Sequence, residues 1–194
     1  MKKILFLLCV SLLYKTAVAQ QTDLHASIPF DPEVRTGVLP NGMTYYVRRN
    51  IKPEHRAELR LVLNAGSILE TDQQQGLAHL CEHMAFNGTT NFEKSELVDF
   101  LERTGVRFGA DLNAYTSFDE TVYMLQIPTD TEKVFLKGIQ ILQDWVQNVT
   151  YDSTEIDKER GVVVEEWRLG QGASDRMLRK NFPVLFHDSR YADR

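Results

Sequence analysis

Residues 76–88 have the sequence Gly-Leu-Ala-His-Leu-Cys-Glu-His-Met-Ala-Phe-Asn-Gly, which decides how the rest of the chain is interpreted. The stretch holds two imidazoles four positions apart, His79 and His83, with the carboxylate of Glu82 between them. The closing Asn-Gly pair is typical of the end of a helix, so we predict a helix over residues 75–86. Such a helix can hold a divalent metal ion and place a base beside it.

The helical positions of these side chains separate a polar face from an apolar one. At about 100° per residue, Glu82 and His83 lie within about 60° of His79. The apolar side chains fall on the other side, where we expect them to pack on a sheet: Leu77, Leu80, Cys81 and Met84. Histidines of a buried core would lie among the leucines, so the pattern favours a metal site. Cys81 is predicted to be a small buried hydrophobe rather than a ligand.

A second helix is predicted to supply the third ligand. Catalytic zinc takes three protein ligands and keeps one position for water. Residues 152–155, Asp-Ser-Thr-Glu, resemble a capping box and open a helix that runs to about Leu169. Its apolar stripe is predicted to comprise Ile156, Val163 and Trp167.

Two acidic residues of this second helix lie beside the apolar stripe. Glu159 and Glu166 are seven positions apart, so either can face the first helix, whereas Glu165 points to the opposite side and is expected to be solvated. A glycine inside a helix costs about 1 kcal/mol relative to alanine, so Gly161 indicates a close approach of another helix.

The remaining pattern predicts an α+β fold, a mixed and largely antiparallel sheet with helices packed on it. An Asn-Gly pair between two β-prone runs predicts a hairpin over residues 35–49. The other expected strands are residues 57–64, 106–108 and 121–127, and the other expected helices are residues 94–103 and 131–149.

The N-terminus has the pattern of a secretory signal peptide over residues 1–19. A basic start is followed by the apolar run of residues 4–14 and by Ala-Val-Ala, which predicts cleavage after Ala19. The run is too short for a bilayer, which needs roughly 20 residues. We therefore expect export, most simply to a bacterial periplasm, with no membrane attachment after cleavage. Residues 20–34 are predicted to be an extended lead-in to a domain over residues 35–194.

Charge and cysteine content argue against a nucleic-acid-binding protein and against a domain stabilised by disulfides. The net charge is −5 and no Lys/Arg run occurs, so nothing favours binding to nucleic acid. Once the signal peptide is removed, Cys81 is the one cysteine left, and no internal disulfide can form.

The motif His-x-x-Glu-His is an inverted zinc motif, and the chain resembles the N-terminal catalytic domain of a pitrilysin- or insulinase-type metallopeptidase. Four segments carry the resemblance in order: residues 39–42, 76–88, 113–117 and 159–166. The similarity spans about residues 35–190. This ordered set is more specific than the zinc motif alone.

The resemblance implies a role for each residue of the metal site. His79, His83 and Glu166 match the ligands of one Zn²⁺ ion. Glu82 matches the catalytic base, which takes a proton from a zinc-activated water and passes it to the leaving amine. Glu159 matches an acidic residue that supports the site without usually binding the metal, and it can accept a hydrogen bond from a ligand histidine.

The resemblance also implies residues that bind substrate. Asn113 and Ala114 match a strand that contacts the substrate backbone, and Phe86 matches a residue near a side-chain pocket. An extended peptide can add to an exposed strand through backbone hydrogen bonds. The alternatives are that Phe86 packs in the core and that Asn113 is a turn residue.

The implied function is that of a zinc-dependent endopeptidase acting on peptides or unfolded polypeptide segments. Members of the family pair homologous domains into a chamber, so we expect the domain to continue past residue 194 and to need homologous C-terminal domains or a partner subunit. By itself the 194-residue chain is expected to be weakly active or inactive. The alternative is a non-catalytic peptide-binding or scaffold subunit, against which the intact metal set argues.

Overall fold

The computed structural model describes residues 26–107, 109 and 111–193 of the 194-residue chain. The predicted signal peptide and the start of the predicted lead-in lie outside these residues. The chain divides into two compact units, one ending at Asn50 and one beginning at Ile51. Along the described part of the chain, no helix is both long enough and apolar enough to cross a membrane.

The first unit is a β-hairpin, as predicted. Strands β1 (Val34–Val38) and β2 (Thr44–Arg48) pair antiparallel. The guanidinium of Arg48 donates to Asp31 and Glu33, each at 2.9 Å, and so ties the lead-in to the second strand.

The second unit is built on a three-stranded antiparallel sheet. Its strands are β3 (Arg56–Leu63), β4 (Leu112–Thr116) and β5 (Thr121–Pro128), in the order β3-β5-β4. Side chains alternate between the two faces of the sheet, as in Arg60 and Leu61, of which the first is exposed and the second buried. The predicted α+β architecture with an antiparallel sheet is confirmed.

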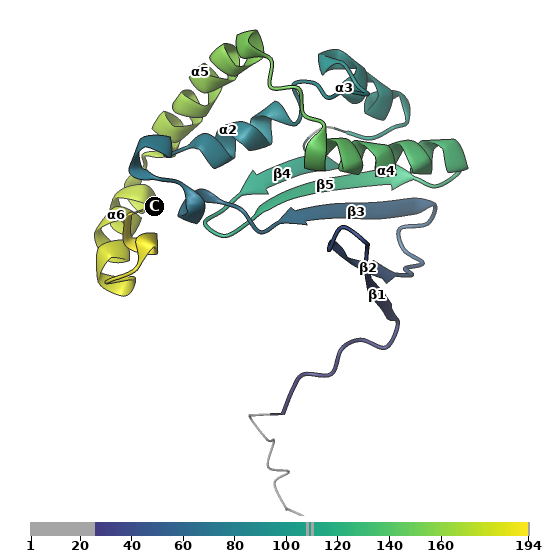
Figure 1. Cartoon of the computed structure of the whole chain (residues 1–194), viewed down its shortest axis with the longest axis horizontal. Helices are drawn as coiled ribbons and strands as arrows, with labels where there is room; N and C mark the ends of the chain where they lie inside the picture. Colours follow the sequence, from purple (N-terminus) through teal and green to yellow (C-terminus); the bar gives the residue numbers. More distant parts are fainter. Residues whose placement is uncertain (1–25, 108, 110, 194) are drawn as a thin grey trace, which may run out of the picture. The chain divides into compact units, whose positions relative to one another are not determined.

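Helices cover the apolar face of this sheet (Figure 1). The helices are α2 (Leu77–Met84), α3 (Lys94–Arg103), α4 (Glu132–Gln147), α5 (Ser153–Gly170) and α6 (Ala173–Leu185), with short 3₁₀ helices η1 (Ser67–Leu69), η2 (Asp72–Gln74) and η3 (Arg190–Asp193). Helix α4 packs on β3 and β5, and α2 packs on β4 and α5. Gly138 permits the close approach of α4, because a Cβ at that position would collide with Ile127 of β5.

The predicted helices are confirmed, and their N-terminal ends lie within one or two residues of the predicted positions. The structure differs from the prediction at two other places. Helix α6 was not predicted, because Pro183 lies inside it and proline disfavours a helix interior. The predicted strand at Val106 is wrong. Its amide bonds to Leu101 and closes the end of α3, and Asp111 accepts from the amide of Arg107, so the chain turns there.

A buried polar network joins the loop after α2 to α4. The carboxylate of Asp144, which is fully buried, accepts from Thr89 Oγ1 at 2.6 Å, Asn91 Nδ2 at 2.8 Å and Asn148 Nδ2 at 2.9 Å. Burial tends to raise the pKa of Asp144, but these hydrogen bonds outweigh it and bring the pKa below its usual value. The next residue, Trp145, donates from Nε1 to the carbonyl of Ala85 at 3.0 Å.

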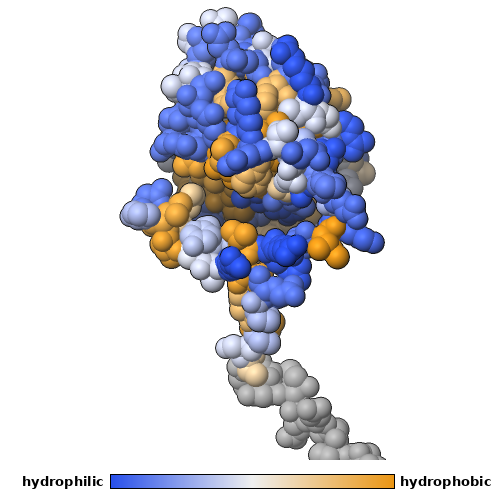
Figure 2. All heavy atoms as spheres, turned by 90° about the vertical axis from the view of Figure 1, so that its right-hand side faces the viewer, coloured by the Kyte–Doolittle hydropathy of each residue, from blue (hydrophilic) through white to orange (hydrophobic). Residues whose placement is uncertain are grey.

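The surface carries both hydrophilic and exposed apolar side chains. On the face shown in Figure 2, hydrophilic residues cover most of the surface, and hydrophobic residues are visible in patches between them. Several exposed apolar side chains belong to α5 and α6, among them Trp167, Leu169, Met177 and Leu178.

Replacing Asp144 with Asn is expected to lower the free energy of unfolding by about 1–3 kcal/mol at pH 7, because the amide cannot accept at both terminal atoms. The folded-state pKa of Asp144 lies below 3.8, so the carboxylate contributes stability above that pH and loses it as the pH falls through the folded-state pKa. Urea unfolding at pH 7 and about pH 3 should show the difference between the two proteins shrinking on acidification.

The control for this measurement is Asp157→Asn. The side chain of Asp157 is 72% exposed and pairs with Arg160 on the surface, so its replacement should leave the free energy of unfolding nearly unchanged. Equal destabilisation by the two substitutions would contradict the role of the buried network.

Candidate metal centre

Helix α2 presents both histidines and Glu82 on the side that faces a pocket. The opposite side packs inward through Met84, which is fully buried. The expectation for Leu77 is wrong, because it lies at the start of α2 and is 44% exposed. Cys81 is half-buried and is not among the described groups that could hold a metal ion.

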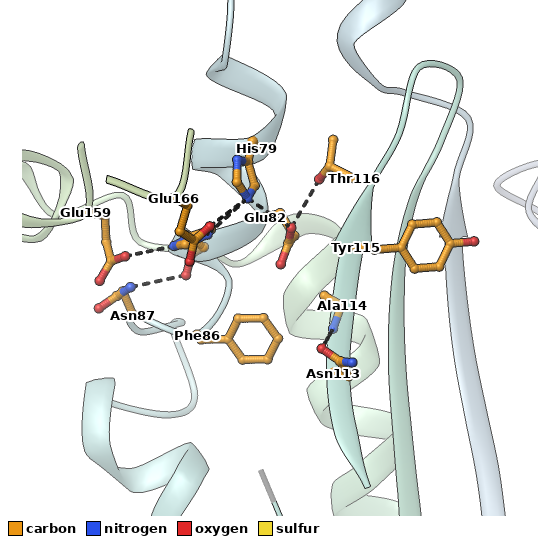
Figure 3. A pocket seen from close by; sticks show the side chains of 11 residues that line it. His79, Glu82, Phe86, Asn87, Asn113, Ala114, Tyr115, Thr116, Glu159 and Glu166 are labelled. Carbon is orange, nitrogen blue, oxygen red and sulfur yellow. Dashed lines mark hydrogen bonds and ion pairs between the residues drawn. The ribbon is translucent and has the colours of Figure 1, made fainter. Parts of the chain in front are cut away.

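The packing of α2 against α5 brings the three predicted ligands together (Figure 3). His79 Nε2 and His83 Nε2 are 3.2 Å apart, and each lies 3.4 Å from Glu166 Oε2. Among the described residues, these three form a group whose ligand atoms all lie within 4.8 Å of one another.

These separations fit a tetrahedral zinc ion. Zn–N and Zn–O bonds of about 2.0–2.2 Å place two ligand atoms of a tetrahedron about 3.3–3.6 Å apart. The observed 3.2–3.4 Å lies close to this range. Two imidazoles and one carboxylate are also the donor set of catalytic zinc sites that keep one position for water. The three side chains therefore fit zinc in both geometry and chemistry.

Glu159 lies behind the ligands rather than among them. Its Oε2 is 2.9 Å from His83 Nδ1, and its side chain is only 17% exposed. With Glu159 ionised, Nδ1–H of His83 donates to the carboxylate, which leaves Nε2 as the unprotonated atom on the side of Glu166. The contact therefore orients the ring and selects its tautomer.

Glu82 is the most buried acidic group of the pocket. It is 8% exposed, and its Oε2 accepts from Thr116 Oγ1 at 3.3 Å and lies 4.0 Å from His79 Nε2. Burial raises the pKa of Glu82, while protonated His79 or His83 and the hydroxyl of Thr116 lower it, and the charge of Glu166 adds to the rise. A carboxyl group with a raised pKa is suited to taking and returning a proton near neutral pH.

The pocket has a volume of about 500 Å³ and lies between the two metal-site helices and β4. Phe86 lines it and also packs on the rings of Tyr123 and Trp145, so its ring is shared between the pocket and the core, and its contact with substrate stays a prediction. Asn113 and Ala114 line it from β4, where Asn113 Oδ1 accepts from the amide of Ala114 at 2.9 Å. Asn113 is thus a strand residue and not a turn residue.

Helix α5 meets some of the expectations for its faces and contradicts others. The side chain of Glu165 is 61% exposed and pairs with Arg168, as expected for the solvated face. Trp167 does not belong to a packed apolar stripe, because it is 57% exposed and lies under the guanidinium of Arg179. The inference from Gly161 is wrong as well, since no described atom would come within 4 Å of a Cβ there.

Three residues near the site were missed in the sequence. Thr116 contacts Glu82, Asn87 Nδ2 donates to the carbonyl of His83 at 3.1 Å, and Glu70 accepts from two amides at the start of α2. The sequence does hold one indication of Glu70. Gly76 precedes the helix and has no side chain to cap it, so a cap has to come from elsewhere.

Comparison with known proteins agrees with this geometry. Residues 45–182 match the family model described as Insulinase (Peptidase family M16). The chain is 39% identical over 189 residues to the probable zinc protease PqqL of Haemophilus influenzae, an alignment that covers 96% of this chain and 20% of that protein.

Solved structures show the same similarity. The first half of the periplasmic protease PqqL from Escherichia coli matches with a TM-score of 0.82 at 38% identity, over 87% of this chain and 36% of that one. The ferredoxin protease FusC, solved in complex with Arabidopsis ferredoxin, matches with a TM-score of 0.74 at 30% identity, over 83% of this chain and 18% of that one.

The chain spans about a fifth of the length of the curated relatives it matches. Within that span, the family model covers most of the second unit and the end of the hairpin. The family resemblance inferred from the zinc motif is confirmed, and the chain belongs to the insulinase family of peptidases, family M16.

Proposed function

We propose that this chain is the zinc-binding catalytic domain of an endopeptidase that hydrolyses peptides or unfolded polypeptide segments. One observation carries the proposal: three ligand atoms from α2 and α5 lie 3.2–3.4 Å apart, with the buried carboxylate of Glu82 beside them. Membership of a peptidase family and similarity to proteins named zinc proteases support it.

Each residue of the metal site has a separate task in this proposal. His79, His83 and Glu166 hold one Zn²⁺ ion. When bound, zinc would supply Lewis acidity, which lowers the pKa of water towards about 7 and polarises a carbonyl. Glu82 accepts the proton of the attacking water and donates it to the leaving amine, for which its raised pKa is suited. Glu159 keeps His83 in the tautomer that a ligand needs.

In the described three-stranded sheet β4 is an edge strand, which offers a place for the substrate backbone. The amide of Gln126 donates to the carbonyl of Asp111. In the antiparallel register this means that the backbone N–H and C=O groups of the odd-numbered residues of β4 point toward β5. The backbone groups of Ala114 and Thr116 therefore point away from β5, on the side of the pocket. An extended peptide can pair there, with a side chain over Phe86. Asn113 has to release the amide of Ala114 when that happens.

The comparisons also inform location and partners. The Escherichia coli relative is named a periplasmic protease, and FusC was solved with a ferredoxin. We propose that this protein is exported to the periplasm by the predicted signal peptide and acts on polypeptides. Because its relatives are about five times longer, we propose that homologous domains complete the chamber around this pocket.

Replacing Glu82 with Gln in the full-length protein is expected to lower the rate of peptide cleavage by about 10²–10⁴-fold, because the amide cannot accept the proton of the attacking water. Zinc content should stay at the wild-type level, since Glu82 is not a ligand. Cleavage of an unstructured fluorogenic peptide and metal analysis measure the two quantities. Unchanged cleavage would exclude Glu82 as the base. Absence of cleavage in the zinc-loaded wild type would favour a non-catalytic subunit.

Replacing Glu166 with Gln is expected to weaken zinc binding by about 100-fold or more, beyond the 10–100-fold that the loss of an outer partner of a ligand costs. Glu165→Gln is the matched control, because the neighbouring side chain points to solvent. Competition with a chromophoric chelator measures both affinities. Equal losses would contradict the assignment of Glu166 as the third ligand.

A further inference from the structure

A carboxylate from outside α2 caps the start of this helix. Glu70 Oε1 accepts from the amide of Ala78 at 2.7 Å, and Glu70 Oε2 accepts from the amide of Gly76 at 3.0 Å. Glu70 is only 7% exposed, although it lies in the segment between two short 3₁₀ helices. Both of its oxygens are thus committed to the first turn of the helix that carries the histidines.

Helix α2 is too short to be stable in isolation, so its first turn depends on contacts with the rest of the fold. It has eight residues, whereas isolated helices below about 12–15 residues are marginal in water. Its N-cap residue is Gly76, which provides no side-chain cap, and its first turn contains no acidic residue. The carboxylate of Glu70 therefore supplies the acceptors for the amides of Gly76 and Ala78 and a negative charge at the positive end of the helix dipole.

The two histidines are supported from opposite ends of α2. At the C-terminal end, Asn87 Nδ2 donates to the carbonyl of His83, and Trp145 donates to the carbonyl of Ala85. At the N-terminal end, His79 directly follows Ala78, whose amide Glu70 binds. Fraying of the first turn would displace His79 and leave His83 in place.

The backbone around Glu70 is itself held in position. The amides of Ser67 and Ile68 donate to the carbonyls of Ser117 and Phe118 in the β4–β5 turn, at 3.1 and 2.9 Å. Gly66 lies so close to these carbonyls that a Cβ would collide with them. The guanidinium of Arg190 donates to the carbonyl of Glu70. The carboxylate is therefore presented to α2 from a preformed loop.

We propose that Glu70 is a positioning residue of the metal centre, which sets the place of His79 by capping the first turn of α2. The inference rests on the proposed zinc site and adds a residue from outside the pocket to it. Glu70 is not among the residues that line the pocket, and it acts through the helix. Its loss should therefore weaken metal binding by more than the loss of a helix cap elsewhere in the fold.

The test compares zinc affinities of the full-length protein, measured by chelator competition well below the melting temperature of every variant. Glu70→Ala is expected to bind zinc at least about tenfold more weakly, the lower end of what the loss of a supporting residue costs. Glu70→Gln, which keeps one acceptor oxygen, should fall between Glu70→Ala and the wild type. The visible spectrum of bound Co²⁺ should lose intensity in Glu70→Ala, because His79 no longer completes the tetrahedral set.

The matched control is Glu96→Ala. The carboxylate of Glu96 accepts from the backbone amide of Glu93 at the start of α3, a helix that contributes no residue to the pocket. This variant should lose thermal stability and retain wild-type zinc affinity.

The outcomes separate the two proposals. Wild-type protein that binds no zinc would overturn the proposed function itself. Tight binding by the wild type, with unchanged zinc affinity in Glu70→Ala and Glu70→Gln, would overturn only the role of Glu70. If Glu70→Ala does not fold, Glu70→Gln decides, and wild-type affinity in that variant would overturn the role of Glu70.

Discussion

The contact between α2 and α5 is the constraint on which the rest of the site depends. It brings the imidazoles of His79 and His83 against the carboxylates of Glu159 and Glu166, with Glu82 on the same side of α2. Three carboxylates in one partly buried pocket repel one another and lose hydration, which is unfavourable unless positive charge compensates. A divalent cation at the meeting point of Nε2, Nε2 and Oε2 would provide that charge. In the proposed site, metal binding would therefore be coupled to the packing of the two helices.

Burial divides the work among the acids. Glu166 is half-exposed and its Oε2 faces both imidazole Nε2 atoms, the geometry of a ligand. Glu159 is largely buried and faces the far nitrogen of His83, where it can orient the ring without reaching the metal position. Glu82 is buried against β4 and Thr116, and burial raises its pKa, the direction that the proposed proton transfer needs. Three glutamates thus have different surroundings, which suit them to the three different roles proposed.

Much of this arrangement could be predicted because the patterns are local. The Asn-Gly pair gives the hairpin, and the helical phase of residues 76–88 separates the ligands from Met84. The failures arise where tertiary contacts override local pattern. Val106 is apolar because it fills the core at the end of α3, not because it belongs to a strand. Helix α6 forms in spite of Pro183. No described atom lies close to Gly161, and Trp167 lies under a surface guanidinium. The position of a residue around a helix cannot distinguish such surroundings from a packed interface between helices.

The amino-acid sequence by itself determined which chemical groups are available and how they are spaced within each helix, since 3.6 residues per turn fix the face on which a side chain lies. It therefore identified His79, Glu82 and His83 as one set. Only the tertiary structure decided how groups from distant segments combine: that Glu166 Oε2 meets both imidazoles, that Glu159 stands behind His83, and that Glu70 caps the first turn of α2. These contacts depend on how helices and loops pack in space, and side-chain spacing along one element carries no record of that packing.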